Sequence, residues 1–178
     1  MRTMAVVLAL VVTSLALAQS LRTGTKTSAE TLVAYHAQAS ATATLKDDVT
    51  AAFKALWDAC QQNAFHPIGL PVLCLDLTSV ETGVAKWEVW WPLADAVDPA
   101  GPPPTTQFKT KLAPAVPVAY AYYTGDPWQV GDTLLKLQAW ATNQGLAPSS
   151  RARAFIYLDP IERDDRNPVI ECQVELEQ

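Results

Sequence analysis

The sequence predicts a single α+β domain over residues 31–178, built from duplicated βαββ units with an antiparallel sheet, helices on one face and a ligand groove between the halves. Two segments, 44–60 and 126–145, repeat apolar residues at helical spacing. Each is preceded by one strand-like segment and followed by two. Residues 94–106 contain three consecutive prolines and are expected to form a stiff connector between the copies.

The first copy covers residues 31–93 and is predicted to contain three strands and one helix. The helix is expected to begin at Thr44, because an acidic residue, Asp47, follows three positions later as in a capping box. Its apolar residues then recur every three or four positions, so they share one face. This face consists of Val49, Phe53, Leu56 and Cys60, and the strands are expected over 31–36, 70–77 and 85–93.

The second copy, residues 107–178, repeats this arrangement. Its helix has clear end signals: Asp126 can cap the start, Pro127 suits the first helical position and Gly145 suits the C-terminal cap. The apolar residues of the helix again fall on one face. This face consists of Val130, Leu134, Leu137 and Ala141, and the strands are expected over 115–123, 153–158 and 168–176.

The spacing of matching residues supports the duplication. Val33 and Val118 lie 85 positions apart, and Glu88 and Glu171 lie 83 apart. The matching residues of the two helices lie 81 apart, from Val49 onward. Because four elements recur in one order with a nearly constant offset, we expect the two halves to be related by a pseudo-twofold.

The N-terminal residues have the three parts of a secretory signal peptide. Arg2 gives a positive start, residues 4–17 are apolar, and an A-x-A cleavage site ends at Ala18. The apolar run is shorter than the ~20 residues that span a bilayer, so we expect residues 1–18 to be removed and the mature protein to be periplasmic or secreted, without membrane insertion. Residues 19–30 are polar and aperiodic and are predicted to form a flexible leader.

Charge and composition argue against several classes of site. The chain has 13 basic and 18 acidic residues, a net charge of −5, and no basic run, so we expect no nucleic-acid partner. There is no C-x-x-C motif, and His36 and His66 are far apart in sequence, so neither a metal site nor a cofactor is expected. Cys60, Cys74 and Cys172 leave two alternatives open: buried free thiols, or a Cys60–Cys74 disulfide, which export would permit.

Side-chain alternation assigns one face of each strand to the helices and the other to a groove. In the last strand Ile170 and Cys172 belong to the apolar set, so Glu171 faces away from the helices. Trp87 and Trp91 are expected to pack between the halves. The candidate ligand-binding residues are Glu88, Trp90, Tyr122, Trp128, Phe155, Tyr157 and Glu171.

A groove of aromatic and acidic side chains suits a small hydrophobic or aromatic ligand held by ring contacts. A cationic ligand is an alternative, because carboxylates and ring faces both attract positive charge.

Four segments, 86–93, 118–128, 157–160 and 169–174, resemble the gyrase-inhibitor-like (GyrI-like) small-molecule-binding domains, which also serve as effector-binding domains of AraC-type and MerR-type regulators. The resemblance implies the duplicated fold and a ligand groove between the halves. The family often carries a glutamate two residues before the tyrosine of the third segment, where this chain has Phe155. No helix-turn-helix segment is found, so we expect a stand-alone binding protein and not a transcription factor.

Three functions therefore remain open from the sequence. The first is binding of a small molecule without catalysis. The second is hydrolysis of a small molecule, with Glu171 or Glu88 as general base and Tyr122 or Tyr157 orienting the substrate. The third is recognition of a protein partner through exposed aromatic residues, with the oligomeric state undetermined.

Overall fold

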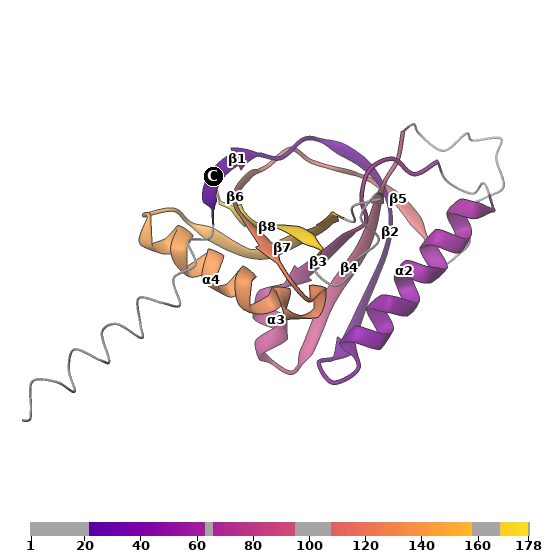
Figure 1. Cartoon of the computed structure of the whole chain (residues 1–178), viewed down its shortest axis with the longest axis horizontal. Coiled ribbons are helices and arrows are strands. Elements are labelled where there is room, and N and C mark those ends of the chain that lie inside the picture. The colour runs from indigo at the N-terminus through magenta and orange to yellow at the C-terminus, as the bar shows by residue number, and fades with distance from the viewer. Residues whose placement is uncertain (1–21, 63–65, 95–107, 158–167, 178) are drawn as a thin grey trace, which may run out of the picture.

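The computed structural model describes residues 22–62, 66–94, 108–157 and 168–177; the predicted signal peptide, residues 1–18, and nearly all of the predicted connector lie outside this part of the chain. Figure 1 shows the arrangement. The elements are β1 (Thr23–Thr27), β2 (Thr31–Ala41), α2 (Leu45–Gln61), β3 (Val72–Asp76), α3 (Leu77–Glu81), β4 (Val84–Pro92), β5 (Lys109–Ala113), β6 (Pro117–Thr124), the 3-10 helix η1 (Pro127–Gln129), α4 (Val130–Asn143), β7 (Pro148–Tyr157) and β8 (Val169–Leu176).

All eight strands form one antiparallel sheet in the order β1-β6-β8-β7-β3-β4-β2-β5. This order reads the same from either end once β1 is matched with β5, β2 with β6, β3 with β7 and β4 with β8. The two halves are therefore related by a pseudo-twofold between β3 and β7. The predicted α+β fold with duplicated units is confirmed, but each copy has one more strand than expected and is a ββαββ unit.

The additional strands lie in the predicted leader and at the start of the predicted second copy, just after the connector. β1 falls within the predicted flexible leader, residues 19–30, and pairs with β6 from Thr23 to Thr27. That prediction is wrong for this stretch, because strand pairing and β-branched threonines stabilise an extended chain that carries no apolar alternation. β5 pairs in the same way with β2 of the other half.

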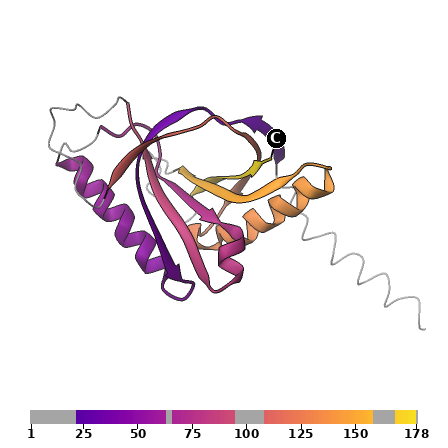
Figure 2. The same ribbon diagram turned by 180° about the vertical axis from the view of Figure 1, so that it is seen from behind.

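The two additional strands take part in a ribbon that arches over the sheet. The Ser28 N–H donates to the Val116 carbonyl oxygen at 2.8 Å, and the Val116 N–H donates to Ser28 Oγ at 3.0 Å. These bonds continue the register in which β1 pairs with β6 and β2 with β5. The segment β1–β2 and the segment β5–β6 therefore run together across the inner face of the curved sheet, the face opposite the helices, as the tops of Figure 1 and Figure 2 show.

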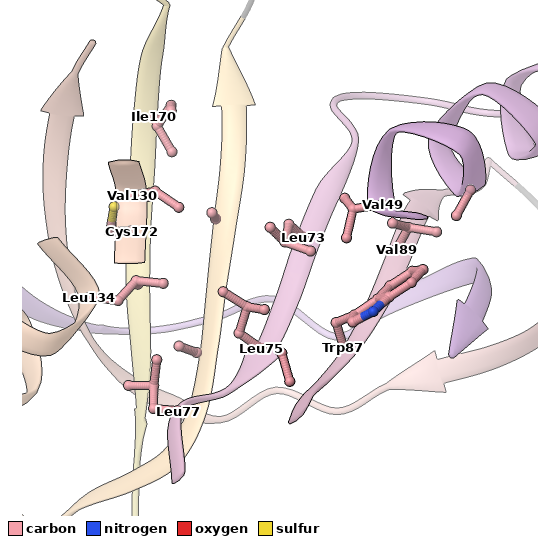
Figure 3. Packing of buried hydrophobic residues seen from close by; sticks show 14 of the residues in the cluster. Val49, Leu73, Leu75, Leu77, Trp87, Val89, Val130, Leu134, Ile170 and Cys172 are labelled. Carbon is pink, nitrogen blue, oxygen red and sulfur yellow. The ribbon is translucent and has the colours of Figure 1, made fainter. Parts of the chain in front are cut away.

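The helices lie on the outer face of the curved sheet and bury their predicted faces there (Figure 1). One continuous cluster of apolar side chains joins both halves under α2 and α4, part of which Figure 3 shows. Phe53 is half-buried against this core. The remaining residues of the two predicted helical faces are buried: Val49, Leu56, Cys60, Val130, Leu134, Leu137 and Ala141.

Local signals explain the helix ends. The Asp126 carboxylate accepts a hydrogen bond from the Trp128 N–H at 2.9 Å, so the predicted cap is present, although it opens η1 and α4 follows directly. Gly145 has φ +75°, the left-handed conformation typical of a C-terminal cap. The segment predicted as a simple connection between two strands contains the short helix α3, which the Asp76 carboxylate caps through the Thr78 N–H at 3.1 Å.

The two tryptophans expected to pack between the halves lie instead on the helix side, against elements of the first half. Trp87 is buried, and its indole N–H donates to Ser40 Oγ at 3.0 Å. Trp91 is half-buried against the same core, and its ring lies 5.2 Å from that of Trp57 on α2. Within the described residues, no helix is long and apolar enough to cross a membrane.

Candidate functional site

The inner face of the sheet, beneath the ribbon, holds two neighbouring cavities. The larger has a volume of about 740 Å³ and the smaller about 210 Å³. Trp90, Ala113 and Arg153 line both, so these residues stand between the cavities. The larger volume lies within the range of about 300–1,000 Å³ that is common for small-molecule sites. We call the two cavities together the groove.

Four of the sequence-predicted site residues lie together at the groove. Trp90 lines both cavities, Glu88 lines the larger one, and Phe155 and Glu171 line the smaller one. They come from β4, β7 and β8, and strand alternation places them opposite the helix-facing core. Trp90 and Phe155 also pack in a small apolar cluster on this face, together with Val72.

Two other candidates, Tyr122 and Trp128, are placed differently, and for Tyr157 the structure describes the backbone. Tyr122 lies on β6 with an exposed side chain, and its ring meets Tyr120 edge-on at 5.9 Å; it lines neither cavity. Tyr157 ends β7, where its backbone pairs with Val169. Trp128 precedes α4, and the Lys46 ammonium of α2 lies 5.7 Å from its ring centroid, which places Trp128 on the helix side and away from the groove.

Glu88 belongs to a compact network of charge and aromatic rings. Its carboxylate forms an ion pair with Lys111 of β5 and accepts a hydrogen bond from the Trp90 indole N–H at 2.5 Å. The Lys111 ammonium lies 4.3 Å from the ring centroid of Tyr35 and 4.6 Å from that of Trp90. Lys111 therefore occupies the space over two aromatic faces and beside a carboxylate, which is the environment that favours a cation.

Glu171 belongs to a matching network in the other half. Its carboxylate forms an ion pair of 2.5 Å with Lys26 of β1 and accepts a hydrogen bond from Gln173 Nε2 at 2.7 Å. The Lys26 ammonium lies 5.1 Å from the ring centroid of Tyr120. Glu171 is only 3% exposed, so this carboxylate is buried and fully engaged by protein groups.

The two networks are related by the pseudo-twofold. Lys26 pairs with Val118 in the same way that Lys111 pairs with Val33. Equivalent strands supply the tyrosines and the glutamates. The sequence contained a signal for the lysines, because Thr25-Lys26 and Thr110-Lys111 are also 85 positions apart, but neither stretch was recognised as a strand.

Arg153 is a third basic residue of the groove that sequence reasoning missed. It is 5% exposed, forms an ion pair with Glu175 of the neighbouring strand, and places its guanidinium carbon 5.0 Å from the Trp90 ring centroid. Each groove carboxylate supplied by β4 and β8, including Glu88 and Glu171, therefore has an internal cation as partner.

The three cysteines are free thiols, so the predicted alternative of a Cys60–Cys74 disulfide is not found. The reason is topological, because Cys60 lies in the helix-side core and Cys74 lines the groove on the other face of the sheet. Burial raises the pKa of Cys74 well above its ordinary value. Burial, with a smaller contribution from Glu171, raises the pKa of Cys172 to about 12. Both thiols are therefore protonated near neutral pH. Among the described residues, no group of three His, Cys, Asp or Glu side chains is arranged to hold a metal ion.

No protein-family model matches the chain, and no curated protein is similar to it in sequence. Solved structures, in contrast, share its fold. The C-terminal domain of EcmrR matches with a TM-score of 0.65 at 14% identity, over 90% of this chain and 99% of that one. In a complex of EcmrR with DNA, 98% of this chain matches 64% of the EcmrR chain with a TM-score of 0.72 at 12% identity.

Two further neighbours have different descriptions. A hydrolase from Listeria innocua matches with a TM-score of 0.58 at 8% identity, over 92% of this chain and 96% of that one. SAV2435, solved bound to tetraphenylphosphonium, matches with a TM-score of 0.55 at 8% identity, over 88% and 94%. At these identities the likeness is one of fold. That fold agrees with the one implied by the resemblance to GyrI-like domains.

Proposed function

We propose that this protein binds a small, largely apolar or aromatic molecule in the groove and performs no chemistry on it. The main observation that supports this proposal is the pair of adjoining cavities beneath the ribbon, which share Trp90 as a wall. Trp90 is only 8% exposed and donates a hydrogen bond to Glu88, so this wall of the groove is already formed without a ligand. The neighbour solved with tetraphenylphosphonium supports a hydrophobic ligand for this fold.

We further propose that the protein acts outside the cytoplasm as a stand-alone binding domain. The signal-peptide pattern of residues 1–18 supports export, and the acidic composition without a basic run supports a role unrelated to nucleic acid. Expression of the full chain with an alkaline phosphatase fused to its C-terminus tests export. Phosphatase activity that depends on residues 1–18 is expected, and equal activity without them would contradict the proposal.

Hydrolysis is the second candidate, supported by the neighbour described as a hydrolase. The geometry favours binding, because the carboxylate of Glu171 is engaged by Lys26 and Gln173 and that of Glu88 by Lys111 and Trp90. A general base must instead present a free lone pair to water or substrate. Turnover of a screened ester or epoxide that disappears in Glu171→Gln, while binding persists, would favour hydrolysis.

A protein-binding role for Trp90 is not supported, because its indole is buried in the groove. A thermal-shift and calorimetry screen with aromatic alcohols, amides, hydrocarbons and lipophilic cations, including tetraphenylphosphonium, tests small-molecule binding. We expect hits that bind wild type and the control Trp57→Leu equally and bind Trp90→Leu at least tenfold more weakly. Trp57 is the matched control because its ring is exposed on α2, on the other side of the sheet. No hit in the whole screen, or hits unaffected by Trp90→Leu, would refute the proposed function.

A further inference from the structure

The groove differs from a binding site for a cationic ligand in one respect. Its own lysines already occupy the positions over aromatic rings and beside carboxylates that a ligand cation would take. Lys111 stands over two rings beside Glu88, and Lys26 stands over Tyr120 beside Glu171. A ligand cation would have to displace one of these ammonium groups and leave it without its carboxylate. Internal cations therefore remove the advantage that a positively charged ligand would otherwise have here.

The charge of the groove lining is nearly balanced, although the whole chain carries −5. Because of this balance, the groove attracts neither an anionic nor a cationic ligand strongly. The ionisable residues that line the two cavities are Lys26, Lys86, Lys111, Arg151 and Arg153 on the basic side and Asp76, Glu88, Glu171 and Glu175 on the acidic side.

Two buried polar atoms at the smaller cavity have no hydrogen-bond partner among the described residues: Arg153 Nε and Gln173 Oε1. Arg153 and Gln173 are directly opposed on β7 and β8, and both line this cavity. The two side chains are 5% and 4% exposed, and a buried polar atom without a hydrogen-bond partner is costly, so a ligand group that pairs with both atoms would be stabilised. One atom is a donor and the other an acceptor, and they project from opposed positions on one face of the sheet.

The orientation of the Gln173 amide is fixed by its neighbour. Its Nε2 donates to the ionised Glu171 at 2.7 Å, and a flipped amide would place two acceptors against each other. The free atom is therefore an acceptor. Arg153 is held in turn by its ion pair with Glu175 and by the ring of Trp90, so the donor is equally well positioned.

We infer that the groove, given the proposed binding function on which this inference rests, recognises an uncharged aromatic ligand that carries a hydroxyl or carboxamide group. That group accepts a hydrogen bond from Arg153 Nε and donates one to Gln173 Oε1. The ring of the ligand lies against the apolar residues of the smaller cavity, Val33, Ala113 and Phe155. A carboxylate satisfies only the donor and is repelled by the acceptor, and a quaternary ammonium satisfies neither.

Four compounds with one ring system test this inference by calorimetry on the full mature chain: 2-naphthol, 2-naphthamide, 2-methylnaphthalene and trimethyl(2-naphthyl)ammonium. We expect 2-naphthol or 2-naphthamide to bind at least tenfold more tightly than the other two. In Gln173→Met the advantage over 2-methylnaphthalene should fall below threefold, whereas the control Gln144→Met, on the exposed end of α4, should retain it.

The variant Arg153→Lys provides a second test if Gln173→Met does not fold, because it keeps the charge beside Glu175 and removes Nε. Equal binding of 2-naphthol and 2-methylnaphthalene, or tightest binding of the ammonium compound, would overturn the inference and leave the proposed function standing. Failure of all four compounds to bind would also overturn the inference. The proposed binding function itself is refuted by a different result, namely no hit in the broader screen or hits that Trp90→Leu does not weaken.

Discussion

Replacement of Lys111 by alanine should convert the groove into a cation site. The substitution removes an ammonium that lies 4.3 Å from the Tyr35 centroid and 4.6 Å from the Trp90 centroid, and it frees the carboxylate of Glu88. Each cation–π contact at a partly exposed site contributes about 1 kcal/mol. Together with the partly exposed carboxylate of Glu88, the vacated position is worth about 2–3 kcal/mol to a ligand cation, or roughly 30- to 140-fold in affinity.

Calorimetric titration of trimethyl(2-naphthyl)ammonium into wild type and Lys111→Ala measures this gain. Lys54→Ala is the matched control, because Lys54 pairs with Asp58 at 2.7 Å on the exposed surface of α2 and contacts no ring that the structure describes. Circular dichroism confirms that each variant keeps its fold. An affinity in Lys111→Ala within threefold of wild type, or an equal gain in Lys54→Ala, would refute the reasoning that an internal lysine excludes cations.

Three further predictions concern stability and thiol chemistry. In urea unfolding, Leu134→Ala should lower the free energy of unfolding by about 2–5 kcal/mol, because this side chain of α4 is fully buried against the sheet. The control Leu135→Ala, at an exposed position of the same helix, should change it by less than about 0.5 kcal/mol, and equal losses would contradict the assigned helix face. Lys26→Ala should cost about 2 kcal/mol, because it removes one charged partner of the buried carboxylate of Glu171, and an unchanged unfolding midpoint would contradict the pairing. At pH 8 the raised pKa of Cys172, about 12, leaves roughly one thiol in ten thousand ionised, so Ellman's reagent should react with this thiol only after unfolding. Because this pKa is higher in the folded than in the unfolded protein, the protonated thiol adds stability below pH ~8.5, and this stability is lost as the pH rises toward 12.

Much of the fold could be predicted from local patterns of apolar and polar residues in the sequence. The two helical faces could be predicted because burial selects apolar residues at a 3.6-residue period, as Val130 to Ala141 show. The inner-face positions of Glu88 and Glu171 followed from strand alternation together with the duplication. Such patterns are local, so one segment is enough to recognise them.

The elements that escaped prediction lack such a local pattern. β1 and β5 are short and polar, and they are strands because each pairs with a strand of the opposite half. This pairing is long-range, so the groove roles of Lys26 and Lys111 could not be read from their neighbours in sequence. The contact of Trp128 with Lys46 could not be predicted for a related reason, because it depends on where the helix start lies relative to α2.

The most direct test of small-molecule binding in the groove is a crystal structure of the protein with the tightest compound from the screen. We predict ligand density beneath the ribbon, in contact with Trp90 and Phe155 and with a polar atom within hydrogen-bond distance of Arg153 Nε. Density for the ligand on the helix side, for example at the Trp57–Trp91 pair, with the groove unchanged, would contradict the account.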